Sequence, residues 1–83
     1  MPRFYFDIAD GLAVQDDEGL ELEGLNAARI EAVRLSGQLL KNSPDRFLSV
    51  GEWSCTVLNE DKLVLFVLHF YAAEAPVLGG AKA

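Results

Sequence analysis

The side chains most able to do chemistry in this sequence are an imidazole, a carboxylate and two hydroxyls. His69 is the only histidine of the 83 residues, and Asp7, Ser54 and Thr56 could join it if their strands lie side by side. A base, an acid and a hydroxyl are the groups of acid–base and nucleophilic catalysis. No local motif links them, and a sheet surface is not a cleft. The pattern therefore favours a histidine packed at a subunit contact or at the wet end of a strand.

Three consecutive acidic residues, Asp16, Asp17 and Glu18, form a second candidate site, because carboxylates can bind a divalent cation. A calcium loop of the EF-hand type needs acids at alternating positions, a glycine at the sixth and a glutamate at the twelfth. That arrangement is absent, and acidic residues are common in turns. We expect a solvated turn and no metal or cofactor.

Cys55 is the only cysteine, and it alternates with Trp53 and Val57 without a basic neighbour. Reactive thiols need an electropositive, accessible setting, so this pattern predicts an inert buried thiol. A single cysteine cannot form an intrachain disulfide, in agreement with a reducing compartment. The N-terminus lacks the apolar core of a signal peptide, and no run approaches the roughly 20 residues of a membrane helix. Cytoplasmic localisation is expected.

Size and charge narrow the function classes further. A chain of 83 residues is expected to form one domain with a core too small for a deep active site. Thirteen acidic residues against seven basic ones give a net charge of -6, and the basic residues are scattered along the chain. Nucleic acid and anionic membranes both attract clustered Lys and Arg, so neither is an expected partner.

The elements that must position these residues follow from hydrophobic periodicity and turn signals. Alternation of apolar and polar residues predicts the early strands. Apolar residues at spacings of three and four predict one helix, which Pro44 ends. The predicted order is strands at Arg3–Ile8 and Leu12–Gln15, a brief extended segment at Leu20–Leu22, a helix at Leu25–Lys41, a connector at Asp45–Gly51, and strands at Trp53–Leu58 and Leu63–Tyr71.

This order predicts an α+β domain over residues 1–71, with a small antiparallel sheet, one helix packed on one face, and a flexible tail at 72–83. The helix should pack through Leu25, Ala28, Ala32, Leu35 and Leu39, widened by Val33 and Leu40, while Phe47 and Leu48 of the connector tuck against the domain edge. The helix-covered sheet face is expected to carry Phe4, Phe6, Ile8, Trp53, Cys55, Val57, Val64, Phe66, Leu68 and Phe70. The open face is expected to carry Tyr5, Asp7, Ser54, Thr56, Leu58, Leu63, Leu65, Val67, His69 and Tyr71.

The segment Leu63–Tyr71 is apolar on both of its faces apart from His69. A strand with one solvent-exposed face should alternate apolar and polar residues. This run therefore requires an apolar layer on each of its faces, and a single helix covers only one face. The mismatch predicts association with a second copy, as a homodimer, or with another protein. The candidate interaction face comprises Tyr5, Leu63, Leu65, Val67, His69 and Tyr71.

The chain contains, in this order, Met1–Asp7, the Asp10-Gly11 turn, Asp17–Leu22 and the helix start Ala27–Ala32, followed by Trp53 and the late strand. Together these segments resemble an uncharacterised family of small acidic proteins common in alphaproteobacteria, including rhizobia. The resemblance covers residues 1–71 and implies a stand-alone cytoplasmic protein, a domain of unknown function without assigned activity. Gly24 stands where that family has Asp, so a strong helix N-cap is not expected. The layout is also loosely similar to antitoxin domains of the HicB type, in topology alone.

Three functions stay open from the sequence. The leading hypothesis is a non-enzymatic protein-interaction module that self-associates through its open sheet face or its last strand. The alternatives are a small-ligand binder or minor enzyme using Asp7, Thr56, His69 and Tyr71, and an antitoxin-like regulator. A well-formed pocket around those four residues would favour the second, and a flat surface the first. Because protonation of His69 would place charge in an apolar contact, association is also expected to depend on pH.

Overall fold

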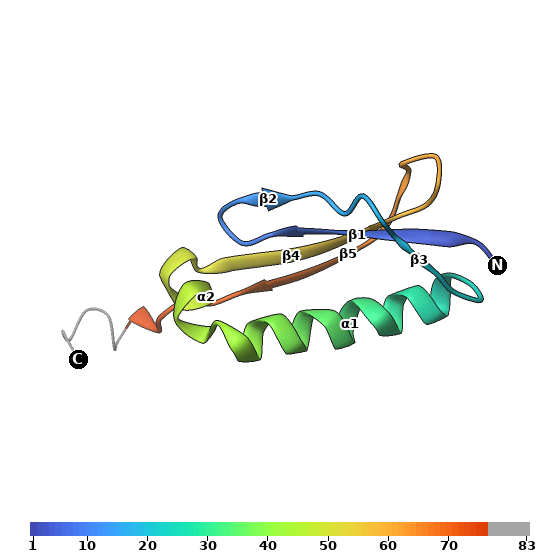
Figure 1. The fold of residues 1–83 in the computed structure, drawn as a ribbon. Coiled ribbons are helices and arrows are strands. Elements are labelled where there is room, and N and C mark those ends of the chain that lie inside the picture. The colour runs from blue at the N-terminus through green and yellow to red at the C-terminus, as the bar shows by residue number, and fades with distance from the viewer. Residues whose placement is uncertain (77–83) are drawn as a thin grey trace.

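The computed structural model describes residues 1–76, which form an antiparallel sheet of five strands and two helices. Figure 1 shows both helices on one side of the sheet, which confirms the predicted α+β class with its helix on one face. The strand order is β2-β1-β4-β5, and β3 pairs with the first residues of β1. The elements are β1 (Arg3–Ala9), β2 (Ala13–Val14), β3 (Leu20–Glu21), α1 (Leu25–Asn42), α2 (Pro44–Val50), β4 (Glu52–Leu58) and β5 (Val64–Tyr71).

Alternating residues of the two central strands, β1 and β4, form the core. Phe6 stands opposite Val57 and Ile8 opposite Cys55, so large and small apolar side chains meet on the helix-covered face. Trp53 is buried at the far end of this row and meets Phe70 edge to face, with ring centroids 5.9 Å apart. The period-two pattern of the sequence therefore placed these side chains correctly.

The helix α1 packs on the sheet through small residues. Ala28, Ala32 and Ser36 are fully buried at a spacing of four, which lets the helix axis lie close to the sheet. The predicted contacts of Leu25 and Leu39 are only partial because both lie near the ends of the helix, and both are substantially exposed. The prediction for Val33 was wrong: it points about 100° around the helix from Ala32 and is 54% exposed. Gly24 makes no side-chain cap, as expected.

The predicted connector at Asp45–Gly51 folds instead into the second helix, α2. Pro44 starts it, where a missing N–H costs nothing, and Gly51 ends it in the left-handed conformation at φ 85°. The Gly51 N–H donates to the Phe47 carbonyl oxygen at 2.7 Å. Phe47 packs against the core as expected, whereas Leu48 is 66% exposed, so its predicted contact with the domain edge was wrong.

A β-bulge changes the parity of β5 at its start. Val57 stands opposite Phe66, but the next β4 residue, Leu58, stands opposite Val64, which leaves Leu65 as an extra residue. Val64 therefore shares the open face with Leu58, and its predicted place on the helix-covered face was wrong. Leu63 lies just before the strand.

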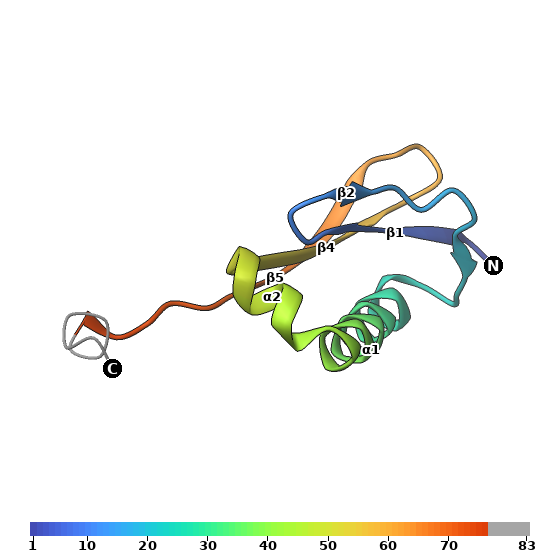
Figure 2. The same ribbon diagram turned by 60° about the vertical axis from the view of Figure 1, so that its left-hand side comes forward.

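The predicted tail, 72–83, falls partly outside the described residues. Within 72–76 the chain is exposed, and the Ala72 N–H still donates to the Gly51 carbonyl oxygen at 3.0 Å. Neither helix of the described chain is both long and apolar enough to cross a membrane. Figure 2 shows α1 nearly end-on below the sheet, with β2 on the opposite side of it.

Candidate functional site

The outer edge of β1 is covered along its whole length. The short strand β3 pairs with Arg3 and Phe4 at one end, and β2 pairs with Ile8 and Ala9 at the other. The gap between them is filled by a side chain, because the Phe6 N–H donates to Asp16 Oδ2 at 3.0 Å. This edge therefore offers no free run of backbone groups to another strand.

Asp16 holds the loop between β2 and β3 in place. Its Oδ1 accepts from the N–H groups of Glu18 and Gly19 at 3.1 Å each, while its own N–H donates to Asp7 Oδ1 at 2.9 Å. Burial raises the pKa of Asp16, but the hydrogen bonds from three backbone N–H groups, with a smaller contribution from Lys62, outweigh it and hold the pKa below its ordinary value. Both carboxylate oxygens of Asp16 therefore accept hydrogen bonds, and the one from the Phe6 N–H closes the sheet edge.

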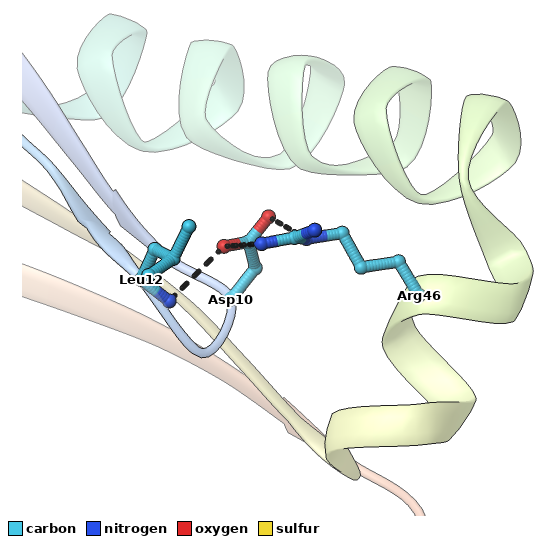
Figure 3. Close-up of polar contacts among 3 residues, drawn as sticks. All are labelled: Asp10, Leu12 and Arg46. Carbon is cyan, nitrogen blue, oxygen red and sulfur yellow. Dashed lines mark hydrogen bonds and ion pairs between the residues drawn. The ribbon is translucent and has the colours of Figure 1, made fainter.

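An ion pair ties the turn after β1 to α2. Arg46 Nε lies 2.9 Å from Asp10 Oδ2, and the Leu12 N–H donates to Asp10 Oδ1 at 3.4 Å (Figure 3). The Arg46 guanidinium keeps the pKa of Asp10 below its usual value. Beside the pair lies a cavity of about 80 Å³, lined by Ile8, Asp10, Leu39, Leu40, Ser43, Arg46, Phe47 and Trp53.

The outer edge of β5 has no partner within residues 1–76. Two observations fix which of its backbone groups point outward. The Ala72 N–H donates to the Gly51 carbonyl, and the Phe6 N–H points away from β4 toward Asp16. Since bonded and non-bonded pairs alternate in antiparallel ladders, both observations place the N–H and C=O groups of Val67, His69 and Tyr71 on the free edge.

The open face does not gather the four residues of the hypothesised small-ligand site. Asp7 and Thr56 stand opposite each other and line an open trough of about 470 Å³ with Leu58 and Val64. His69 and Tyr71 line a separate open depression near Gly51.

The polar groups of the open face are also engaged with other partners. His69 Nε2 lies 3.1 Å from Glu52 Oε1, and the Asp7 carboxylate accepts from the Asp16 N–H. Ser54 stands opposite His69 in the strand register, but the acid paired with the imidazole is Glu52. In the described residues, the acid and the hydroxyl of Asp7 and Thr56 line one shallow depression, and the imidazole of His69 lines another.

The candidate interaction face is largely exposed, with one exception. Tyr5 is partly buried, and Lys62 Nζ lies 4.1 Å from its ring centroid, so a cation already occupies that aromatic face. The other members are exposed: Leu63, Leu65, Val67, His69 and Tyr71. They follow β5 and the turn before it, next to the unpaired strand edge.

The remaining candidates have structural roles. Cys55 is fully buried, and burial raises the pKa of its thiol to about 11, so the thiolate is scarce near neutral pH. Of the three acidic residues Asp16, Asp17 and Glu18, Asp16 uses its carboxylate to hold the loop between β2 and β3. Residues 1–76 contain no cluster of three or more His, Cys, Asp or Glu side chains arranged to hold a metal ion.

Sequence reasoning missed Glu52 as the partner of His69, and it missed Asp16 as the residue that closes the β1 edge. The pattern Asp16-x-x-Gly19 is the available signal for the second, because an Asp side chain often bonds backbone N–H groups shortly after it in the chain. No signal in the sequence pointed to Glu52, since its pairing depends on the strand register.

A family model described as "Domain of unknown function (DUF6894)" matches residues 3–71. No curated protein and no solved structure matches the chain.

Proposed function

We propose that this chain, which belongs to the DUF6894 family, is a non-enzymatic protein-interaction module that forms a homodimer through β5. The observation that carries the proposal is the bare outer edge of β5. It presents the N–H and C=O groups of Val67, His69 and Tyr71 in one row. A second antiparallel strand can satisfy all of them at once.

The composition of β5 supports the proposal. Natural proteins protect a free edge with Lys, Pro, inward-pointing charge, a short strand or a covering segment. β5 is eight residues long and contains no Pro, Lys, Arg, Asp or Glu. Its single bulge lies at the start, before Phe66, and leaves the remainder regular. An edge of this kind invites pairing with another strand, and a two-fold homodimer is the commonest closed assembly.

Exposed side chains beside the edge add apolar area. Val67 is 50% exposed and Tyr71 is 74% exposed, and both lie on the open face next to the outward backbone groups. The imidazole of His69 lies between them, with Glu52 as its partner. Protonation of His69 would bring a charge to this contact, so pH-dependent association stays a prediction. A single buried thiol fits the reducing cytoplasm expected from the sequence.

The test is the absolute mass in solution, measured by light scattering behind size exclusion over a range of concentrations. We expect a dimer for the unmodified chain and a monomer for Val67→Glu, since the substitution places a carboxylate from each copy in an otherwise apolar part of the contact. Val14→Glu is the matched control, because Val14 is 57% exposed and lies on β2, at the opposite side of the sheet. It should leave the dimer intact. A monomer at all concentrations, or equal dissociation by both variants, would refute the proposal.

A further inference from the structure

We infer that the dimer interface extends from β5 onto one flank of α1, so that a second copy docks strand to strand and helix to helix. This inference rests on the proposed function and adds a second surface to it. That surface is a stripe on α1, here called the α1 stripe, formed by Asn26, Ile30, Val33 and Gly37. Their spacings of four, three and four place them on one side of the helix.

The α1 stripe lies directly beside β5. The Arg29 guanidinium carbon is 5.3 Å from the centroid of the Phe66 ring, which fixes this flank of the helix over the start of the strand. Asn26, Arg29, Ile30, Val33 and Phe66 together line an open depression of about 220 Å³. The exposed flank of α1 and the free edge of β5 therefore lie next to each other at the same border of the molecule.

The α1 stripe exposes two β-branched apolar side chains. Ile30 is 49% exposed and Val33 is 54% exposed, although the opposite flank carries Glu31 and Gln38. A Cβ placed on Gly37 would meet no atom within 4 Å, so nothing in the described fold demands a glycine there. In the interior of a helix, glycine lowers stability. Close packing of α1 against its own copy would explain the glycine at position 37, because small residues let two helix axes approach.

The distribution of charge over the surface favours a second copy of the chain as the partner at this border. Seven of the thirteen acidic residues lie between Asp7 and Glu23, on the side of the sheet that carries β2 and β3. β5 and the α1 stripe contain no Asp, Glu, Lys or Arg, and the charged side chains next to them are Arg29 and Glu52. Two copies with a net charge of -6 therefore repel through their β1 sides and meet with least repulsion through β5 and α1.

Two-fold symmetry would bring both surfaces into contact at once. A two-fold axis that sets β5 antiparallel to its copy extends the sheet through the backbone groups of Val67, His69 and Tyr71. The same rotation brings each α1 stripe toward the stripe of the other copy, since both layers end at this border. The surface is thereby self-complementary in its backbone and its apolar side chains, as an isologous interface requires.

The experiment compares Val33→Glu with Gln38→Glu, a matched exposed position on the opposite flank of α1. Dilution series by light scattering should show the dimer dissociation constant raised at least about tenfold by Val33→Glu and less than about twofold by Gln38→Glu. Circular dichroism should show both variants folded, because neither side chain is part of the buried core.

A second measurement keeps the inference falsifiable if Val33→Glu does not fold. Single substitutions Val33→Cys and Gln38→Cys are treated with a short bismaleimide, with buried Cys55 as an inert background. Cross-linked dimer from Val33→Cys alone supports the helix contact. A dimer that Val67→Glu dissociates, but that neither responds to Val33→Glu nor cross-links through Val33→Cys, would overturn the inference and leave the proposed function standing. A chain that is monomeric throughout would overturn both.

Discussion

The strands β1 and β5 flank β4 and have seven and eight residues, yet within residues 1–76 only β1 has the edge that faces away from β4 covered. Residues 10–24 form two short strands and a loop that close that edge, and they carry much of the acidic charge. Within residues 1–76, β5 receives no covering segment, and the strand itself contains no Asp, Glu, Lys or Arg. In this part of the chain, edge protection is thus present on one side of the sheet and absent on the other. The proposed dimer contact through β5 rests on this difference.

The largest effect should come from opening the closed edge with Asp16→Ala. The substitution leaves the N–H groups of Phe6, Glu18 and Gly19 without their acceptor, at a cost of about 3 kcal/mol in the free energy of unfolding. Chemical denaturation measures it. Asp17→Ala, at the exposed neighbouring position, should change stability by less than about 0.5 kcal/mol. Equal effects of the two variants would contradict the role given to Asp16.

Gly19→Ala should disturb the same edge through the backbone. Gly19 has φ of 72°, and a Cβ there would lie 2.9 Å from the Phe4 carbonyl oxygen. The combined strain and clash should lower the free energy of unfolding by about 2 kcal/mol. Glu18→Ala serves as the control, because the Glu18 side chain is exposed and its contacts with the loop are made by backbone atoms. A Gly19→Ala protein as stable as the parent would show that the loop does not seat closely on β1.

Acid should open the closed edge selectively. The pKa of Asp16 is lower in the folded chain than its ordinary value of 3.8, so its contribution to stability is complete above that pH and is lost as the pH falls through the folded pKa. The stability difference between the parent chain and Asp16→Ala should therefore shrink below about pH 4. Denaturation curves at a series of pH values measure the difference. A difference that stays constant down to pH 2 would argue against the carboxylate's role.

The smallest effect should come from Arg46→Ala, which releases the turn after β1 from α2. Both partners of the Arg46–Asp10 pair are partly exposed, so the loss should not exceed about 1 kcal/mol and should shrink in high salt. Arg34→Ala is a suitable control, because the Arg34 ion pair within residues 1–76 is with Glu31 of its own helix. A large loss from Arg46→Ala would mean that this pair, rather than Asp16, anchors the covering segment.

Much of the fold followed from local pattern. The alternation of β1 and β4 and the helical spacing of α1 are repeated over enough residues to stand out from the sequence. The helix α2 is only seven residues long and offers too short a window, so Asp45–Gly51 was predicted as a connector. The bulge at Leu65 adds a single residue and leaves no trace in the hydrophobic pattern, which is why Val64 was assigned to the wrong face.

The candidate site was predictable in its side chains and less so in its geometry. The double-sided apolar pattern of Leu63–Tyr71 already indicated an unsatisfied strand, with Val67 and Tyr71 among its exposed residues. Which strands lie at the edges depends on long-range pairing, so the sequence did not show that one edge is closed by Asp16. The α1 stripe was also missed, because Ile30 and Val33 become a surface only once the position of Phe66 is known.

Amide hydrogen exchange in β5, measured by NMR at high and low protein concentration, tests the central claim most directly. The N–H groups of Leu68 and Phe70 point toward β4 and should be protected at both concentrations. Those of Val67, His69 and Tyr71 should be protected at high concentration and exchange rapidly on dilution, because they are unpaired within residues 1–76 and a second copy covers them in the proposed dimer. Rapid exchange of these three amides in a sample that is demonstrably dimeric would contradict pairing through the β5 edge.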